Sequence, residues 1–245
     1  MKNVLGFIGI VLVTTIGFAF ISDTDECTAA YFNREGYVLT ITMYDSTGKA
    51  DARREMTVGE VQMVGDTLFT NVTLISSSGV GKPDRKQMKF RCIHNMYSMD
   101  GRSILTAMNA QVPLNFVRFT EMNLDMPQYA LKLRVNDTLP DSDVRLAFHI
   151  RQSLGMKLPS SRITAIYRNR KCTALDTLHI GELSCFTYVI ESDIESNVVA
   201  AREGVNTVGR SKEWFSPQYG IIRTEYYENS RLIRYEVATK ITVPQ

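Results

Sequence analysis

Apolar and polar residues alternate with a period of two along most of this chain, and this pattern constrains the fold more than any other feature of the sequence. In the segment 37–44, Leu39 and Ile41 fall on one face of an extended chain, whereas Thr40 and Thr42 fall on the other. Such alternation is typical of an antiparallel strand with one face in the core and one in water. Similar alternation marks the segments Glu55–Met63, Thr67–Ser76, Gln87–Ile93, Arg145–Arg151, Arg162–Arg168, Leu183–Ile190, Gly220–Tyr227 and Leu232–Ile241.

Only one segment indicates a helix. Ser103 can cap a helix that runs to Val112, because the apolar residues between them are spaced as on one helix face. The segment Pro113–Tyr129 is rich in Met and Asn and has no regular pattern, so we expect a loop over one end of the sheet. The residues therefore predict one all-β domain of roughly ten strands with one short helix.

The first 22 residues have the form of a secretory signal peptide. Lys2 precedes an apolar run from Val4 to Ile21, and the small residues near its end suit cleavage after Ala19 or after Ser22. The alternative is a retained N-terminal anchor, because the run is near the lower length for a membrane span. We expect a signal helix at residues 1–22 that is removed, and a domain at residues 23–245 that is exported to the periplasm.

The charge pattern excludes some partners. The formal net charge is only +2, and the signs are mixed along the chain, which is not the footprint of a nucleic-acid-binding protein. The segment Gly79–Lys82 lacks the spacing and the Ser/Thr of a phosphate-binding loop. We therefore expect neither nucleic acid nor a cofactor to bind.

Four cysteines occur after the leader, and an even number in an exported chain favours two disulfides. Four cysteines allow three pairings, and the sequence does not choose among them. Cys172 and Cys185 flank a turn that contains Gly181, which makes pairing across neighbouring strands plausible and would leave Cys27 with Cys92. The alternative is that the cysteines are unpaired and buried as small apolar residues. A metal site is not expected, because no CxxC motif occurs and the three histidines are scattered.

No arrangement of residues indicates catalysis. Glu225 and Glu228 lie near each other in a predicted strand, but a glycosidase needs two carboxylates that face each other across a cleft. The serines do not form a nucleophile elbow, and each histidine stands without an adjacent partner in the sequence. We therefore expect a protein without enzymatic activity, in which Glu225 is an ordinary, solvated strand residue.

Aromatic residues are concentrated at the two ends of the chain, and the termini of a rolled sheet often lie near each other. On a concave sheet they could line a site for an apolar or carbohydrate ligand. The alternative, that they pack the core of the sheet, is favoured by the general abundance of aromatic residues in strands. The candidate ligand-binding residues are Tyr37, Trp214, Phe215, Tyr219 and Tyr227.

The tail of the chain, Trp214–Val237, carries its only tryptophan and is typical of a β-hairpin. Pro217 and Gly220 form a turn before the first strand, and Asn229-Ser230 form a turn before the second. This tail, together with the turn Tyr44–Lys49, resembles the TapB-like group of exported bacterial domains of unknown function, which is widespread in Bacteroidetes. The resemblance extends over nearly the whole chain after the leader.

The resemblance implies a single curled antiparallel sheet, a β-roll or half-barrel, similar in outline to periplasmic carriers of lipoproteins. It carries over no catalytic residue, because the group has no established activity. We expect a non-catalytic envelope protein whose concave sheet binds a hydrophobic, glycan-like or lipidated client. One alternative is a structural or assembly factor that contacts envelope proteins through its surface or sheet edge, and another is a hydrolase. The oligomeric state is left open.

Overall fold

The alternating segments of the sequence form strands in the computed structural model, which describes residues 26–78, 82–109, 117–150, 161–200 and 203–244. The predicted signal peptide, residues 1–22, lies outside the described residues. Within those that are described, no helix is long and apolar enough to cross a membrane.

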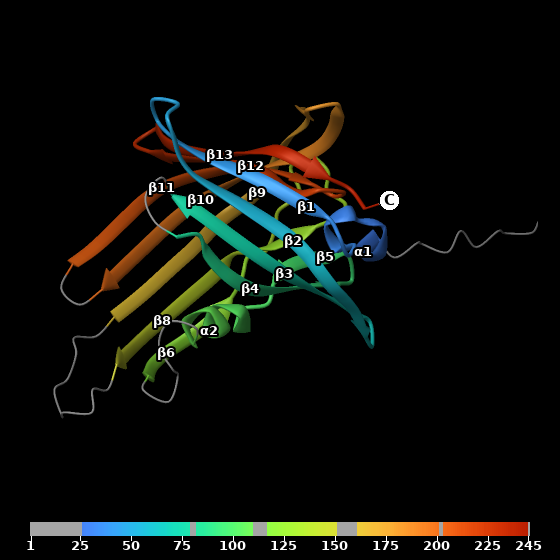
Figure 1. Cartoon of the computed structure of the whole chain (residues 1–245). Coiled ribbons are helices and arrows are strands. Elements are labelled where there is room, and N and C mark those ends of the chain that lie inside the picture. Colours follow the sequence, from blue (N-terminus) through green and yellow to red (C-terminus); the bar gives the residue numbers. More distant parts are fainter. Residues whose placement is uncertain (1–25, 79–81, 110–116, 151–160, 201–202, 245) are drawn as a thin grey trace, which may run out of the picture.

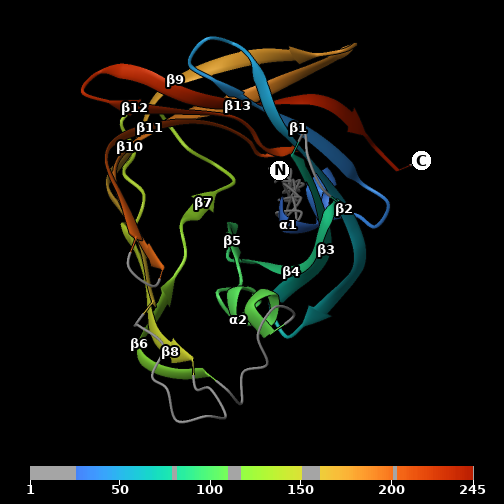
Figure 2. The ribbon, with the colours of Figure 1, turned by 60° about the vertical axis from the view of Figure 1, so that its left-hand side comes forward.

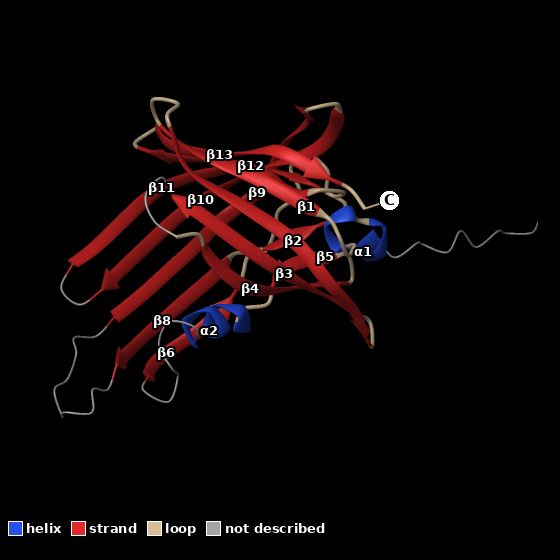
Figure 3. Cartoon of the chain, in the orientation of Figure 1, coloured by secondary structure: helices blue, strands red, loops and turns tan. Residues whose placement is uncertain are grey.

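Thirteen strands make up one antiparallel sheet (Figure 1, Figure 3). The strands are β1 Val38–Asp45, β2 Ala50–Val64, β3 Thr67–Ser78, β4 Asp84–Ile93, β5 Met96–Met99, β6 Val117–Asp125, β7 Gln128–Ala130, β8 Ser142–Ile150, β9 Ser161–Ile180, β10 Leu183–Ala200, β11 Glu203–Ser216, β12 Gly220–Glu228 and β13 Arg231–Thr242. The helical elements are α1 Glu26–Ala29, the 3-10 helix η1 Tyr31–Asn33 and α2 Arg102–Asn109.

The order of the strands is β6-β8-β9-β10-β11-β12-β13-β1-β2-β3-β4-β5-β7, so the first and last strands of the chain pair in the middle of the sheet. The two end strands, β6 and β7, are consecutive in the sequence, and only residues 126–127 separate them. Three residue steps span at most about 11 Å, whereas thirteen flat strands would span close to 60 Å. The sheet must therefore curl until its two ends meet at this corner, as Figure 2 shows.

The curled antiparallel sheet confirms the predicted all-β fold, whereas the expected loop at Pro113–Tyr129 is wrong in part. Residues 117–125 form β6 and residues 128–130 form β7. The strand β6 has β8 as its only neighbour, and its large apolar residue Met122 is 56% exposed. Val117 and Phe119 alternate with polar residues, and so do Met122 and Leu124, but a register shift between Phe119 and Glu121 changes the phase, so no single period-two pattern spans the strand.

The predicted helix is present, but its start differs from the expectation. The Asp100 side chain accepts a hydrogen bond of 3.1 Å from the backbone nitrogen of Arg102 at the helix start. Ser103, expected as the cap, instead bonds the backbone of Lys89, with its oxygen 2.6 Å from the Lys89 nitrogen. Ser103 therefore fixes α2 against β4. Residues 110–112, which the prediction included, lie outside the described residues.

One of the two expected disulfides is formed. Cys27 in α1 is bonded to Cys92 in β4, with Cα atoms 5.7 Å apart, and this bond fastens the helical start of the domain to the sheet. The expected pairing of Cys172 with Cys185 is wrong, since both are free thiols and buried. Cys172 faces Ile190 and Cys185 faces Leu178 across the β9–β10 ladder. Six residue steps along a strand separate the two positions by about 20 Å, too far for a disulfide.

The hairpin predicted for the tail is confirmed. Trp214 and Phe215 end β11, Gly220 begins β12, and Asn229-Ser230 connect β12 to β13. The φ angles of Asn229 and Ser230 are both positive, 48° and 63°, as a two-residue type I′ hairpin turn requires. Asn tolerates this conformation well, so the turn forms without the glycine that usually accompanies it.

Candidate ligand cavity

A cavity of about 390 Å³ lies inside the curl of the sheet and is partly open to solvent, and its volume is within the range of roughly 300–1,000 Å³ that small-molecule sites occupy. The lining residues come from both halves of the sheet and from η1. They are Phe32, Tyr37, Leu39, Ile41, Arg54, Met56, Val58, Val72, Leu74, Met88, Phe90, Tyr97, Met99, Tyr129, Tyr167, Glu213, Tyr219, Gly220, Ile221, Ile222, Arg223, Thr224, Tyr226 and Glu236.

The wall formed by β1–β4 is apolar because one phase of the alternation faces inward. On β3, Val72 and Leu74 line the cavity, whereas Thr73 between them bonds Gln87 on the other face. On β4, Met88 and Phe90 line the cavity in the same way. The period-two pattern therefore sets the chemistry of this wall directly.

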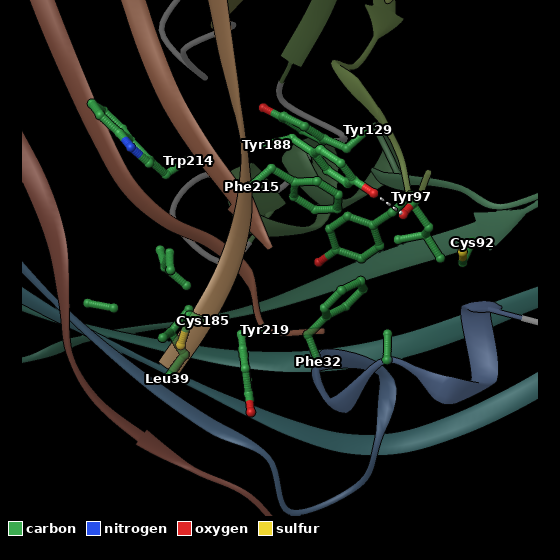
Figure 4. Close-up of a cluster of buried hydrophobic side chains, with 14 of the residues drawn as sticks. Phe32, Leu39, Cys92, Tyr97, Tyr129, Cys185, Tyr188, Trp214, Phe215 and Tyr219 are labelled. Carbon is green, nitrogen blue, oxygen red and sulfur yellow. Dashed lines mark hydrogen bonds between the residues drawn. The ribbon is translucent and has the colours of Figure 1, made fainter. Parts of the chain in front are cut away.

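Aromatic rings in contact with one another form one boundary of the cavity. The ring of Phe32, carried by η1, lies 4.4 Å from the ring of Tyr97, and the Tyr129 ring lies 5.0 Å from that of Phe215. Phe215 itself is fully buried behind these rings (Figure 4). The sequence analysis favours core packing over ligand binding for the aromatic residues, and Phe215 does pack in the core.

The opposite part of the lining carries charge. Glu213 on β11 faces Thr224 on β12, and Thr224 faces Glu236 on β13, so both carboxylates lie on the inner face two strands apart. Glu236 accepts a hydrogen bond from Arg54, with Nη1 and Oε2 3.2 Å apart. Glu213 accepts one from the Tyr129 hydroxyl at 3.0 Å. Each acid therefore has a partner within the cavity wall.

Burial raises the pKa of Glu213 above its ordinary value. The positive charge of Arg170 and the hydrogen bond from Tyr129 act in the opposite direction, and the negative charge of Glu236 adds to the rise. Burial likewise raises the pKa of Tyr167 to about 12. Both shifts favour uncharged side chains on this part of the wall.

Two of the five candidate ligand-binding residues reach the cavity. Tyr37 and Tyr219 line it, and the Tyr37 hydroxyl donates a hydrogen bond of 2.8 Å to the backbone oxygen of Tyr219. Phe215 is buried behind the lining, and Trp214 and Tyr227 lie on the other face of their strands. The five residues therefore do not form one surface.

Trp214 belongs to a polar cluster on that other face, and Figure 4 shows it pointing away from Phe215. Its indole nitrogen donates to Asp176 Oδ2 at 2.9 Å, and the cationic groups of Lys212 and Arg223 lie 5.0 and 4.9 Å from its ring. Arg223 and Tyr227 both hydrogen-bond the carboxylate of Glu225. Glu225 is thus a strand residue, as the sequence predicts, but the expectation that it is solvated is wrong, because it is buried within this network.

The charged part of the lining was missed by sequence reasoning, although the sequence contains a signal for it. Arg54 lies in phase with Met56 and Val58, so it belongs to the apolar face of β2. A charged residue on an otherwise apolar face of a strand indicates a polar site inside the curled sheet. The residues that meet it, Glu236 and Glu213, come from the other end of the chain, and only the curl brings them together.

In the part of the chain that the structure describes, no group of three or more His, Cys, Asp and Glu side chains could hold a metal ion.

The profile of the DUF3108-like family matches residues 34–237. The chain is similar to a candidate exported protein with a YmcC-like fold from Bacteroides fragilis, at 21% identity and a TM-score of 0.60, covering 86% of this chain and 97% of that one. It is also similar to a candidate lipoprotein from Parabacteroides distasonis, at 16% identity and a TM-score of 0.63, covering 87% and 98%. Comparison with curated proteins gives no match. At these identities the two structures support the fold alone.

Proposed function

The chain belongs to the DUF3108-like family, and we propose that it is an exported, non-catalytic protein that binds an elongated, mainly apolar ligand inside its curled sheet. The observation that carries this proposal is the 390 Å³ cavity with its apolar wall from β1–β4. Protein interiors are normally close-packed, and voids larger than a water molecule are few. A hollow of this size among methionine, valine and leucine side chains fits a site for apolar groups.

Three observations support export. The leader has the form of a signal peptide, the structural neighbours are named as candidate exported protein and candidate lipoprotein, and Cys27 and Cys92 form a disulfide. Disulfides persist mainly in oxidising compartments such as the periplasm.

The two carboxylates in the cavity support a binding role more than a hydrolytic one. A retaining or inverting glycosidase needs one acid free to donate a proton and a second free to attack or to activate water. Here Glu236 is paired with Arg54, and Glu213 is bonded to Tyr129. Both acids are therefore engaged in holding the wall together.

The test uses a neutral dye, N-phenylnaphthylamine, whose fluorescence rises in apolar surroundings. We expect the purified mature protein to bind it, and Leu74→Trp to weaken binding by about tenfold or more, since the indole fills part of the cavity. Thr73→Trp is the matched control, because Thr73 is the adjacent residue on the other face of β3.

Native mass spectrometry of the protein purified from its own host gives an independent readout, since a retained apolar molecule should be absent from Leu74→Trp. Equal dye binding by both tryptophan variants and the unaltered protein would place the dye elsewhere and overturn the proposal.

A further inference from the structure

The buried polar atoms without a hydrogen-bond partner gather at one place in the described part of the chain. They are Ser142 Oγ, Arg170 Nε and Nη2, Ser192 Oγ and Ser211 Oγ. The register places their residues on one face, because Ser142 faces Tyr167, Ser192 faces Ser211, and Ser211 faces Tyr226. Tyr167 and Tyr226 line the cavity, so this face is the inner one.

A bulge in β9 adds Arg170 to this inner face. Between Tyr167 and Cys172 the pairing with β10 shifts, and Asn169 takes a positive φ of 53°. The bulge allows Arg170 to point inward although it lies three residues from Tyr167. Its guanidinium lies 4.9 Å from the centre of the Tyr129 ring, which also lines the cavity.

Arg170 is a buried cation whose hydrogen bonds use only part of its guanidinium. It is 1% exposed, and its hydrogen bonds to the described residues run from Nη1 to the backbone oxygens of Gln128 and Pro140. Among the described residues it forms no ion pair within 4 Å. Most buried polar groups in native proteins are paired, so two N–H groups without a partner among the described residues leave the Arg170 guanidinium only partly satisfied.

A second arginine on the inner face, like Arg170, has no acid of the described residues within 4 Å. Arg234 faces Tyr226 across the β12–β13 ladder, and its guanidinium lies 4.2 Å from the Tyr226 ring. Within the described part of the chain it forms no ion pair either. Arg54, by contrast, is paired with Glu236. On β9–β13 the inner face carries the arginines Arg170 and Arg234 and the acids Glu213 and Glu236, and Arg54 from β2 already pairs with Glu236. Three arginines therefore face two acids around this end of the cavity, even with both acids ionised.

Beside the cavity lies a second hollow of about 380 Å³, and Tyr167 and Tyr226 line both spaces. Arg234 and Arg210 line the second hollow together with the hydroxyl residues Ser196 and Thr207, and no acid of the described residues lines it. The interior thus runs from a wall at β1–β4 that is apolar except for Arg54 to a wall at β9–β13 that carries arginine and hydroxyl side chains.

We propose that the ligand is an amphipathic molecule with an acidic head group, whose carboxylate or phosphate oxygens lie at the Tyr167–Tyr226 end near Arg170 and Arg234. This inference rests on the proposed function of the cavity. Arg234 is exposed and meets the head group directly. Arg170 lies behind Tyr129 and does not contact the head group. Its positive charge attracts the acidic head group from a distance, because attraction between charges is stronger in the poorly polarisable protein interior than in water.

The experiment measures displacement of N-phenylnaphthylamine from the mature protein by three molecules with the same twelve-carbon chain: dodecanol, dodecanoate and dodecyl phosphate. We expect one or both acidic amphiphiles to compete about tenfold better than the alcohol, because charge-assisted hydrogen bonds are roughly twice as strong as neutral ones. Comparing the two acids identifies the head group as carboxylate or phosphate.

Variants assign the preference to the arginines. Arg234→Gln should remove most of the advantage of the acids and leave competition by dodecanol unchanged, whereas Arg231→Gln, an exposed arginine of the same strand, should change neither. Because Arg170 is buried, Arg170→Lys is used beside Arg170→Gln. The lysine variant should keep more of the preference than the glutamine variant.

Equal competition by the alcohol and both acids would overturn this inference while leaving the proposed function intact. A preference for acids that survives Arg234→Gln and Arg170→Gln would also overturn it, since other residues would be responsible. Failure of all three amphiphiles to displace the dye, with dye binding unaffected by Leu74→Trp, would refute the proposed function itself.

Discussion

The Tyr129 hydroxyl donates a hydrogen bond of 3.0 Å to Glu213, although the two residues are 84 positions apart in the sequence. Tyr129 lies on β7, an end strand of the sheet, and Glu213 lies on β11, which is far from β7 in the strand order. The bond therefore crosses the inside of the curl. It holds an end of the sheet against its middle and fixes the shape of the cavity between them.

Glu213 should make stability depend on pH. Burial raises the pKa of its carboxyl in the folded state, so the folded protein holds the proton more tightly than the unfolded chain. The contribution of this carboxyl to stability is then largest below about pH 4.3, which is the pKa of Glu in an unfolded chain. It is lost as the pH rises through the pKa of Glu213 in the folded protein. Glu213→Gln cannot lose a proton and keeps an oxygen for Tyr129. Relative to the unaltered protein, it should gain stability between pH 4 and pH 8.

Urea unfolding at a series of pH values measures this difference. Glu60→Gln, an exposed glutamate on β2, provides the control and should follow the unaltered protein at every pH. Parallel stability curves for Glu213→Gln and the unaltered protein would contradict the prediction.

The Cys27–Cys92 disulfide should contribute substantially to stability because it closes a long loop. For a sequence separation of 65 residues, the chain-entropy relation gives a loss of about 4 kcal/mol in the free energy of unfolding when both cysteines are replaced by serine. Alkylation of the unfolded, unreduced protein should modify two thiols, Cys172 and Cys185, as mass spectrometry would show. Modification of no thiol would mean that a second disulfide exists after all.

Gly209 should be intolerant of any side chain. A Cβ at this position would lie 1.9 Å from the backbone oxygen of Tyr227, so β12 would have to move. We expect Gly209→Ala to lower the free energy of unfolding by about 1–3 kcal/mol, as overpacking typically does. Gly59→Ala is the control, because its Cβ would meet nothing closer than 3.7 Å. Equal effects of both changes in urea unfolding would contradict the close approach.

Trp214 should matter for stability and not for ligand binding. Trp214→Phe removes the indole N–H that donates the hydrogen bond to Asp176. We therefore expect the free energy of unfolding to fall by about 1–2 kcal/mol. Because Trp214 lies outside the cavity lining, the affinity for N-phenylnaphthylamine should change by less than about twofold. A loss of affinity comparable with that of Leu74→Trp would show that the cavity extends to Trp214.

Much of the fold was predictable because its signals are local. The alternation at 37–44 predicts a strand, and the same phase that makes Leu39 and Ile41 apolar brings them into the cavity lining. The Asn229-Ser230 turn is likewise recognisable from its residues, since few sequences adopt two successive positive φ angles. The strand β6 was not predicted because a register shift between Phe119 and Glu121 changes the phase of its alternation.

The candidate site was predictable only in part, and its residues show why. Tyr37 and Tyr219 could be selected as aromatic residues near the ends of the chain, but the same criterion selected Trp214, which points the other way. Whether an aromatic residue on a strand faces in or out depends on which phase of the strand faces the core, and the sequence does not say which phase that is. Trp214 lies between Glu213 and Phe215, which both face inward, so it points outward.

The sequence by itself determined the all-β class, the single sheet and the apolar character of one face of β1–β4, because these follow from the period-two geometry of each strand. Only the tertiary structure decided that the sheet curls around a hollow, that Cys172 and Cys185 stay apart, and that Arg170, Arg234 and Glu213 share one wall. Those relationships join residues from distant strands, and the distance between them is set by how far the whole sheet curls, which no local segment encodes.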